Sequence, residues 1–291
     1  TRRSSDLAAI PWRGMGIVPQ DVARAEFIYG KTFEEAAGKT TQRDYGKTVE
    51  YVPLSMPPLV AQEAHSDLFA CGPCWFMLVV LLPVDYWHVQ PVESQGADHL
   101  AIVLLSIVYD AKARGFEVPK MTVDPQSAIV ACRMALASVG CVFDVVAAGA
   151  HVVVVERAVR TVEERVRGAM SGDELFPYDI DRLILSYCVM WIVQCRNSVP
   201  STNSPAISPR ESYLGRLIDA SVEMRTRCGQ YCHVTETVST SYNSVMVPRV
   251  VDCIALISTG SLSGSWKFLS LRSGRVIVRN KFTVQPMNAA I

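Results

Sequence analysis

The chain has 291 residues, of which 49% are hydrophobic, and its 28 basic and 28 acidic side chains give a formal net charge of zero. This composition excludes a disordered tail, and the zero net charge argues against a protein that binds polyanions through overall charge alone. The longest apolar stretches, 76–84 and 183–193, are shorter than the roughly 18 residues that a membrane span needs, so we expect a folded protein without membrane contact.

Residues 1–58 are predicted to be a helical segment ahead of the main core, with a boundary at Pro53, Pro57 and Pro58. The first residues, Thr-Arg-Arg-Ser-Ser-Asp, contain no apolar segment and no starting Met. They favour a piece of a longer polypeptide without a secretory signal. Three strands are then predicted at 59–69, 75–82 and 86–92, with a tight turn at Gly72-Pro73 between the first two.

Helices and strands alternate after residue 92. A helix is expected at 97–114, where apolar residues recur at helical spacing, and Gly115 is expected to end it. The remaining elements expected up to residue 194 are a strand at 118–123, a helix at 126–138, a strand at 141–146, and helices at 151–170 and 179–194. Strands joined by short turns should be antiparallel, and strands joined through helices should be parallel.

This order predicts an α/β fold: a ribonuclease-H-like mixed five-stranded sheet with flanking helices, spanning 59–196. Residues 197–246 are predicted to be a Pro/Ser-rich linker and connecting segment. Short strands at 253–257, 265–271 and 276–279, separated by glycine turns, predict a small β-barrel-like module at 247–291.

Three acids stand out by their positions on these elements. Asp67 lies near the end of the first strand, Asp124 directly after the fourth, and Glu156 in the first turns of a helix. The first and fourth strands are expected to be neighbours, which would bring the three carboxylates together. Such a set can hold two divalent cations for phosphodiester chemistry. Each acid also has an ordinary alternative: Asp124 could cap the next helix, and Glu156 could pair with Arg160.

The spacing and the local contexts of these acids resemble the D,D,E catalytic core of retroviral and retrotransposon integrases. There are 56 residues between Asp67 and Asp124 and 31 between Asp124 and Glu156. The segment 149–165, with Glu156-Arg157 followed by Arg160-Thr161, resembles the glycine-led helix of that family. Gly38-Lys39-Thr40-Thr41 and the segment 259–268 resemble the regions before and after the core in copia-like elements.

The resemblance implies an integrase of a copia-like retrotransposon, which processes DNA 3′ ends and transfers strands to target DNA with two Mg²⁺ or Mn²⁺ ions. Asp67, Asp124 and Glu156 would be both catalytic and metal-binding. DNA backbone contacts are assigned to Arg157, Arg160, Arg272, Arg275 and Lys281, for which a solvated surface is the alternative. The resemblance also implies a homo-oligomer, located in the nucleus or cytoplasm of a host cell within an element-derived particle or complex.

Two cysteine motifs favour other functions. Cys71-Gly72-Pro73-Cys74 matches the tetrapeptide of thioredoxin-like proteins, but the β-favouring run after it better fits a hairpin turn. Cys228, Cys232 and His233 could begin a zinc site, with Cys253 as a candidate fourth ligand. The nine cysteines lie largely in apolar segments, which is typical of free thiols. A further alternative is a catalytically inactive, integrase-derived protein that binds DNA or a partner.

Overall fold

The computed structural model describes Gln20, Arg24 and residues 61–147, 152–170, 180–200, 206–235 and 249–286. The chain divides into two compact units: Thr48–Cys228, and Thr1–Lys47 together with Gly229–Ile291. Gln20 and Arg24 are helical, and the rest of the predicted helical segment 1–58 lies outside the described residues. No helix within the described ranges has the length and apolarity needed to cross a membrane.

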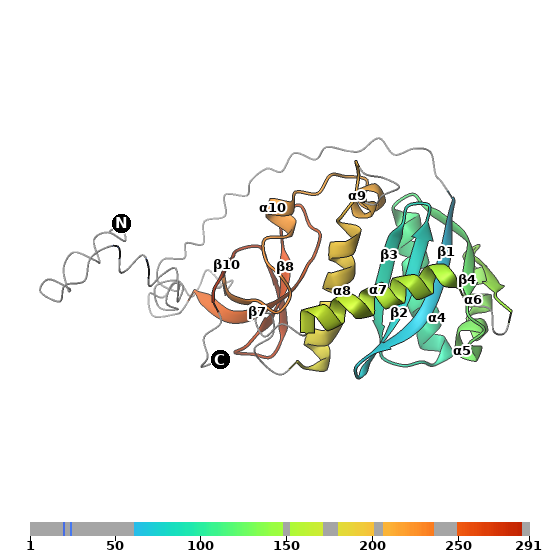
Figure 1. The fold of residues 1–291 in the computed structure, drawn as a ribbon, viewed down its shortest axis with the longest axis horizontal. Helices are drawn as coiled ribbons and strands as arrows, with labels where there is room; N and C mark the ends of the chain where they lie inside the picture. Colours follow the sequence, from blue (N-terminus) through green and yellow to red (C-terminus); the bar gives the residue numbers. More distant parts are fainter. Residues whose placement is uncertain are drawn as a thin grey trace, which may run out of the picture. The chain divides into compact units, whose positions relative to one another are not determined.

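A mixed five-stranded sheet forms the centre of the first unit (Figure 1). Its strands are β1 (Ala61–Cys71), β2 (Cys74–Leu82), β3 (Tyr86–Val92), β4 (Glu117–Val123) and β5 (Val142–Val145). They are ordered β3-β2-β1-β4-β5. The β1–β2 and β2–β3 pairs are antiparallel, and the β1–β4 and β4–β5 pairs are parallel. This is a ribonuclease-H-like topology, so the predicted fold class is confirmed.

Helices cover both faces of this sheet. They are α4 (Ala97–Ala113), α5 (Ser127–Ala131) and α6 (Arg133–Ala137) on one face, and α7 (Val153–Met170) and α8 (Arg182–Asn197) on the other. Successive residues of β2 enter different cores: Met77 and Val79 pack on the α4 side, and Phe76 and Leu78 on the side of α7 and α8. A strand buried on both faces is apolar throughout, which explains the continuous apolar run in the sequence.

The helix predicted at 126–138 is two short helices, α5 and α6, which meet at Cys132. There the backbone N–H donates to Ile129, three residues back, instead of continuing the α-helical spacing. The Cys132 thiol also donates to the carbonyl of Ala97 at the start of α4, 3.3 Å away. Packing against α4 therefore accompanies the interruption, which apolar periodicity does not reveal.

The segment predicted as a linker, 197–246, contains secondary structure in its described parts: α9 (Pro209–Leu214), α10 (Ala220–Glu223) and β6 (Tyr231–Thr235). A capping box begins α9, in which Ser208 and Glu211 each accept the other's backbone N–H through their side chains. Tyr213 then inserts into the core on the α4 side. Helices α9 and α10 belong to the first unit, Thr48–Cys228, which is called the core unit below, whereas β6 belongs to the second unit.

The second unit contains an all-β sheet, as predicted for the C-terminal part of the chain. Its strands are β6 with β7 (Val250–Ser258), β8 (Trp266–Ser270), β9 (Val276–Arg279) and β10 (Phe282–Val284). The order is β10-β6-β7-β8-β9, with every neighbouring pair antiparallel. Phe282 of β10 packs near Trp266 and against Phe268 of β8, with ring centroids 6.3 and 4.9 Å apart respectively. The sheet begins at β6, earlier in the chain than the predicted module at 247.

Candidate active site

The parallel pairing of β1 with β4 brings two of the predicted acids next to each other. The last paired residues are Ser66 and Val123, and Asp67 and Asp124 each follow by one residue. Neighbouring strands lie about 4.8 Å apart, so the two acids leave adjacent backbones at the carboxyl-terminal end of β4. The predicted adjacency of the first and fourth strands is confirmed.

Both aspartates belong to the sheet face that α7 covers. Leu68 and Val123 are core residues of the opposite face, so strand alternation turns Asp67 and Asp124 toward the α7 side. Phe69, two residues after Asp67, lies in the core that α7 and α8 share. The aspartate pair therefore faces the layer that carries Glu156.

The carboxylate of Asp124 has an oxygen, Oδ1, that is buried and has no hydrogen-bond partner. The helix-capping alternative for Asp124 is wrong, because the N-cap of α5 is Gln126 and no side chain caps that helix. Asp67 Oδ1 accepts a 2.7 Å hydrogen bond from the backbone N–H of Leu68. A buried charged oxygen without a donor costs free energy, and a cation is one partner that removes this cost. The neighbouring carboxylates of Asp67 and Asp124 fit a hard divalent cation, which prefers oxygen ligands.

Glu156 lies in the first turns of α7. The helix packs on the sheet through Val155, Ala158, Val162 and Val166, and the half-buried Glu156 stands on the flank of this apolar stripe. In the part of the chain that the structure describes, no three His, Cys, Asp or Glu side chains are grouped closely enough to hold a metal ion. The two aspartates thus face the helix layer that carries Glu156, but the three carboxylates are not close enough together to form a three-ligand metal site.

His65 is a neighbour of the aspartate pair that the sequence analysis did not single out. It lies on β1 two residues before Asp67 and opposite Thr122 of β4. Burial lowers the pKa of the imidazole; nearby Glu63 raises it and Lys120 lowers it further. The sequence could have pointed to His65, because residues two apart on a strand share a face and His65 precedes Asp67 by two.

The arginines predicted to contact DNA are on the surface. Arg157 and Arg160 are exposed on α7, and Arg272 and Arg275 are exposed between β8 and β9. Lys281 is half-buried between β9 and β10. From β7 to β10 the sequence has five Lys or Arg side chains and one acidic side chain, which makes that part of the second unit basic. Basic surfaces of this kind favour polyanions, and the individual DNA contacts stay predictions.

The tetrapeptide Cys71-Gly72-Pro73-Cys74 forms the hairpin turn between β1 and β2. Cys71 and Cys74 lie opposite each other at the end of the ladder, and both are free thiols. Gly72 takes a positive φ of 54°, which suits glycine. A strand follows Cys74 where a thioredoxin-like site needs a helix, so the hairpin interpretation is confirmed.

The residues of the suggested zinc site have other surroundings. Cys232 lies opposite Cys253, and His233 lies opposite Asp252, in the β6–β7 ladder. The Nε2 atom of His233 is 3.4 Å from a carboxylate oxygen of Asp252. Tyr231 also donates a hydrogen bond to that carboxylate. No grouping of three potential ligands occurs here, as elsewhere in the described ranges, so the structure gives no support to a zinc site.

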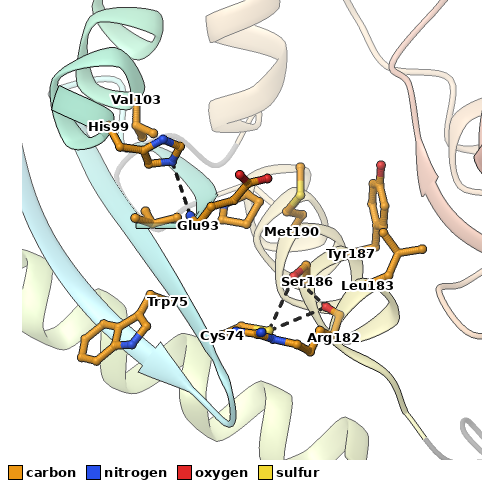
Figure 2. Close-up of a pocket in the computed structure, with 12 residues that line it drawn as sticks. Cys74, Trp75, Glu93, His99, Val103, Arg182, Leu183, Ser186, Tyr187 and Met190 are labelled. Carbon is orange, nitrogen blue, oxygen red and sulfur yellow. Dashed lines mark hydrogen bonds between the residues drawn. The ribbon is translucent and has the colours of Figure 1, made fainter. Parts of the chain in front are cut away.

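A pocket of about 630 Å³ lies between α4 and α8, at the ends of β2 and β3 (Figure 2). Arg182 of α8 donates a 2.8 Å hydrogen bond to the carbonyl of Pro73, and Ser186 donates one of 2.8 Å to the carbonyl of Arg182. On the α4 side, His99 Nε2 accepts from the backbone N–H of Glu93 at 3.4 Å. None of the three predicted acids lines this pocket, so it is distinct from the candidate active site.

No family model and no curated protein matches the chain. Among solved structures, the chain is similar to the catalytic core domain of BIV integrase, with 14% identity and a TM-score of 0.41. The similarity covers 52% of this chain and 93% of that one. The fold class follows from strand order and pairing: the core unit is a ribonuclease-H-like α/β domain, in which Asp67 and Asp124 lie side by side where the β1–β4 pairing ends.

Proposed function

We propose that the chain is a metal-dependent polynucleotidyl transferase: the integrase of a copia-like retrotransposon, which trims the 3′ ends of element DNA and joins them to target DNA. The observation that supports this most is the adjacency of Asp67 and Asp124 on β1 and β4, together with the buried and unpartnered Oδ1 of Asp124. A divalent cation held by the two carboxylates would give this buried oxygen a partner and would remove the cost of its desolvation.

In this proposal Asp67 and Asp124 hold one divalent ion, and Glu156 helps to hold a second. Mg²⁺ or Mn²⁺ would supply neutralisation of the phosphate charge and a more acidic bound water. The protein fixes the spacing of the two aspartates through the strand register, because both strands are interior to the sheet. Lys120 and Asp144 are exposed on the same face of β4 and β5, where they form an ion pair.

The attacking group would be water in 3′-end trimming and a DNA 3′-hydroxyl in joining. Arg157 and Arg160 on α7, and Arg272, Arg275 and Lys281 in the second unit, would bind DNA phosphates. The proposal includes a homo-oligomer that holds two DNA ends, within an element-derived complex in the nucleus or cytoplasm of the host. The basic composition of β7 to β10 supports the DNA-binding part of this assignment.

A second candidate is an integrase-derived protein that binds DNA or a partner without catalysis. One observation favours it: the described residues contain no group of three potential metal ligands. On this alternative, DNA binding persists while the phosphodiester chemistry is absent under all metal conditions.

Strand transfer on a short DNA duplex, with Mg²⁺ or Mn²⁺, separates the two candidates. The proposal expects metal-dependent joining that Asp124→Asn reduces by about a thousandfold or more, since metal-ion stabilisation is worth several kcal/mol. DNA binding and the unfolding midpoint should change little. Asp144→Asn is the matched control, because Asp144 lies on the same face in an exposed ion pair with Lys120, which contributes little to stability.

The outcomes are distinct. Full joining activity in Asp124→Asn would refute the assignment of the site. DNA binding by the wild-type chain, without joining in either metal, would favour the non-catalytic alternative. Equal loss of activity in Asp124→Asn and Asp144→Asn would show that the assay reports the general charge of the sheet face instead of a specific metal ligand.

A further inference from the structure

His65, Thr122, Asp67 and Asp124 form a two-by-two block on the α7-side face of the core sheet. His65 lies opposite Thr122, and the next residues on that face, Asp67 and Asp124, follow one step along the same two strands. Because β1 and β4 run parallel, Asp67 lies two residues after His65 on β1, and Asp124 lies two residues after Thr122 at the end of β4. The imidazole therefore stands directly beside the candidate metal ligands.

Two buried atoms of this block have no hydrogen-bond partner: Nδ1 of His65 and Oδ1 of Asp124. They occupy diagonal positions on neighbouring strands, where the side chains start roughly 7 Å apart. A hydrated divalent cation is large enough to satisfy both atoms. Its ligand oxygens lie about 2.1 Å from the ion, and its coordinated waters donate hydrogen bonds to a second layer of acceptors.

We propose that His65 is a positioning residue of the aspartate pair, whose Nδ1 accepts a hydrogen bond from a water held by the divalent cation at Asp67 and Asp124. This inference rests on the proposed function, because it requires the cation. A neutral imidazole has one acceptor nitrogen, so Nδ1 accepts and Nε2 carries the proton. The contact would fix the direction of that water relative to the DNA phosphate and would strengthen cation binding.

Three substitutions separate this role from simple packing. Asn at position 65 keeps a polar amide atom near the place of Nδ1. Gln moves the amide to the place of Nε2, and Phe keeps the ring volume without an acceptor. Partners of metal ligands typically contribute 10- to 100-fold in metal affinity. We therefore expect His65→Gln and His65→Phe to weaken Mn²⁺ binding by roughly tenfold or more, and His65→Asn by no more than about threefold.

Mn²⁺ binding to the full chain is measured by the electron paramagnetic resonance signal of the free ion, and folding by the unfolding midpoint in EDTA. His99→Phe is the matched control, since His99 is a half-buried histidine of the same unit that lines the pocket beside α8. It should leave Mn²⁺ affinity unchanged. Wild-type affinity in His65→Phe would overturn the inference. So would equal weakening by Asn and Phe accompanied by a lower midpoint in EDTA.

Asp124→Asn, measured in the same way, distinguishes the failure of this inference from the failure of the proposed function. Retained Mn²⁺ affinity in Asp124→Asn would show that Asp67 and Asp124 are not the metal site, and the proposed role of His65 would be rejected with it. Loss of binding in Asp124→Asn alongside wild-type affinity in His65→Phe would leave the proposed function standing and reject only the positioning role.

Discussion

Asn197, at the end of α8, binds both outward backbone groups of Trp87 on the edge strand β3. Its Oδ1 accepts from the Trp87 N–H at 3.1 Å, and its Nδ2 donates to the Trp87 carbonyl at 2.8 Å. Arg196 stacks over the indole ring, 3.9 Å from a ring centroid. Pro91, four residues along the same edge, offers no N–H. A side chain and a proline thus occupy edge positions that could otherwise pair with another chain.

Asn197→Ala should destabilise the core unit by about 2–4 kcal/mol, because it leaves a buried N–H and a buried carbonyl without partners. The free energy of unfolding in urea is the measurement. Gln126→Ala is the control, since the side chain of Gln126 is exposed and makes no capping hydrogen bond, and it should change stability by less than about 0.5 kcal/mol. A decrease in the free energy of unfolding below about 1 kcal/mol in Asn197→Ala would show that the hydrogen bonds from Asn197 to the Trp87 backbone do not stabilise the edge of the sheet.

The segment after α8 is held by a buried ionic triad. Glu223 of α10 accepts from Arg210 at 2.6 Å and from Arg216 at 2.7 Å, and all three side chains are at most 10% exposed. Glu223→Gln leaves two buried arginines without a counter-charge, so we expect a loss of about 3–5 kcal/mol in urea unfolding. Replacing all three by apolar residues of similar size should cost much less, because no charge then stays buried. A Glu223→Gln variant as stable as wild type would show that the triad is solvated in solution.

His88 makes the stability of the core unit depend on pH. Its ring packs edge-on against Tyr86 and Tyr213, and its Nε2 is buried without a partner. Burial lowers its pKa from 6.5 to about 4; Asp110 opposes this shift and Arg114 adds to it. Between pH 6.5 and 4 the unfolded chain takes up a proton at this residue and the folded chain does not. The free energy of unfolding should therefore decrease by about 3 kcal/mol as the pH is lowered from 6.5 to 4.

His88→Phe keeps the ring contacts and removes the titrating group. The difference in unfolding free energy between wild type and His88→Phe should change by about 3 kcal/mol from pH 7 to pH 4, as measured by urea unfolding at each pH. Asp110 contributes in the same direction at lower pH. Hydrogen bonds from Arg114 and Tyr213 outweigh its burial and depress its pKa below 3.8. Parallel pH profiles for the two proteins would exclude His88 as the cause.

The elements predicted best were those whose pattern comes from burial along their whole length. β2 is apolar throughout because both its faces are covered, and α4 repeats its apolar residues at helical spacing. The elements that were missed are α9, α10, β6 and β10, whose three to six residues are too few to show a period. For α9 a readable signal existed, since Ser208-Pro209-Arg210-Glu211 has the spacing of a capping box.

Only part of the candidate site could be predicted from the sequence. The neighbouring positions of Asp67 and Asp124 follow from parallel pairing of two strands that the sequence predicted, so their adjacency could be inferred. The distance of Glu156 from this pair depends on how α7 is placed along the sheet, which is set by tertiary packing. Asn197 lies 110 residues from Trp87, and no local pattern predicts contacts at that separation.

The exposed arginines of α7 provide the last prediction. If Arg157 and Arg160 each neutralise one DNA phosphate, Arg157→Gln and Arg160→Gln should each reduce the salt dependence of duplex binding by a slope of about 1, through counterion release. Fluorescence anisotropy of a labelled duplex over a range of salt concentrations measures this slope. Arg133→Gln is the control, because Arg133 is exposed on α6, on the opposite face of the sheet, and its loss should leave the slope unchanged. Equal effects from all three substitutions would mean that DNA responds to total charge, and the assignment of α7 as a phosphate-binding surface would be wrong.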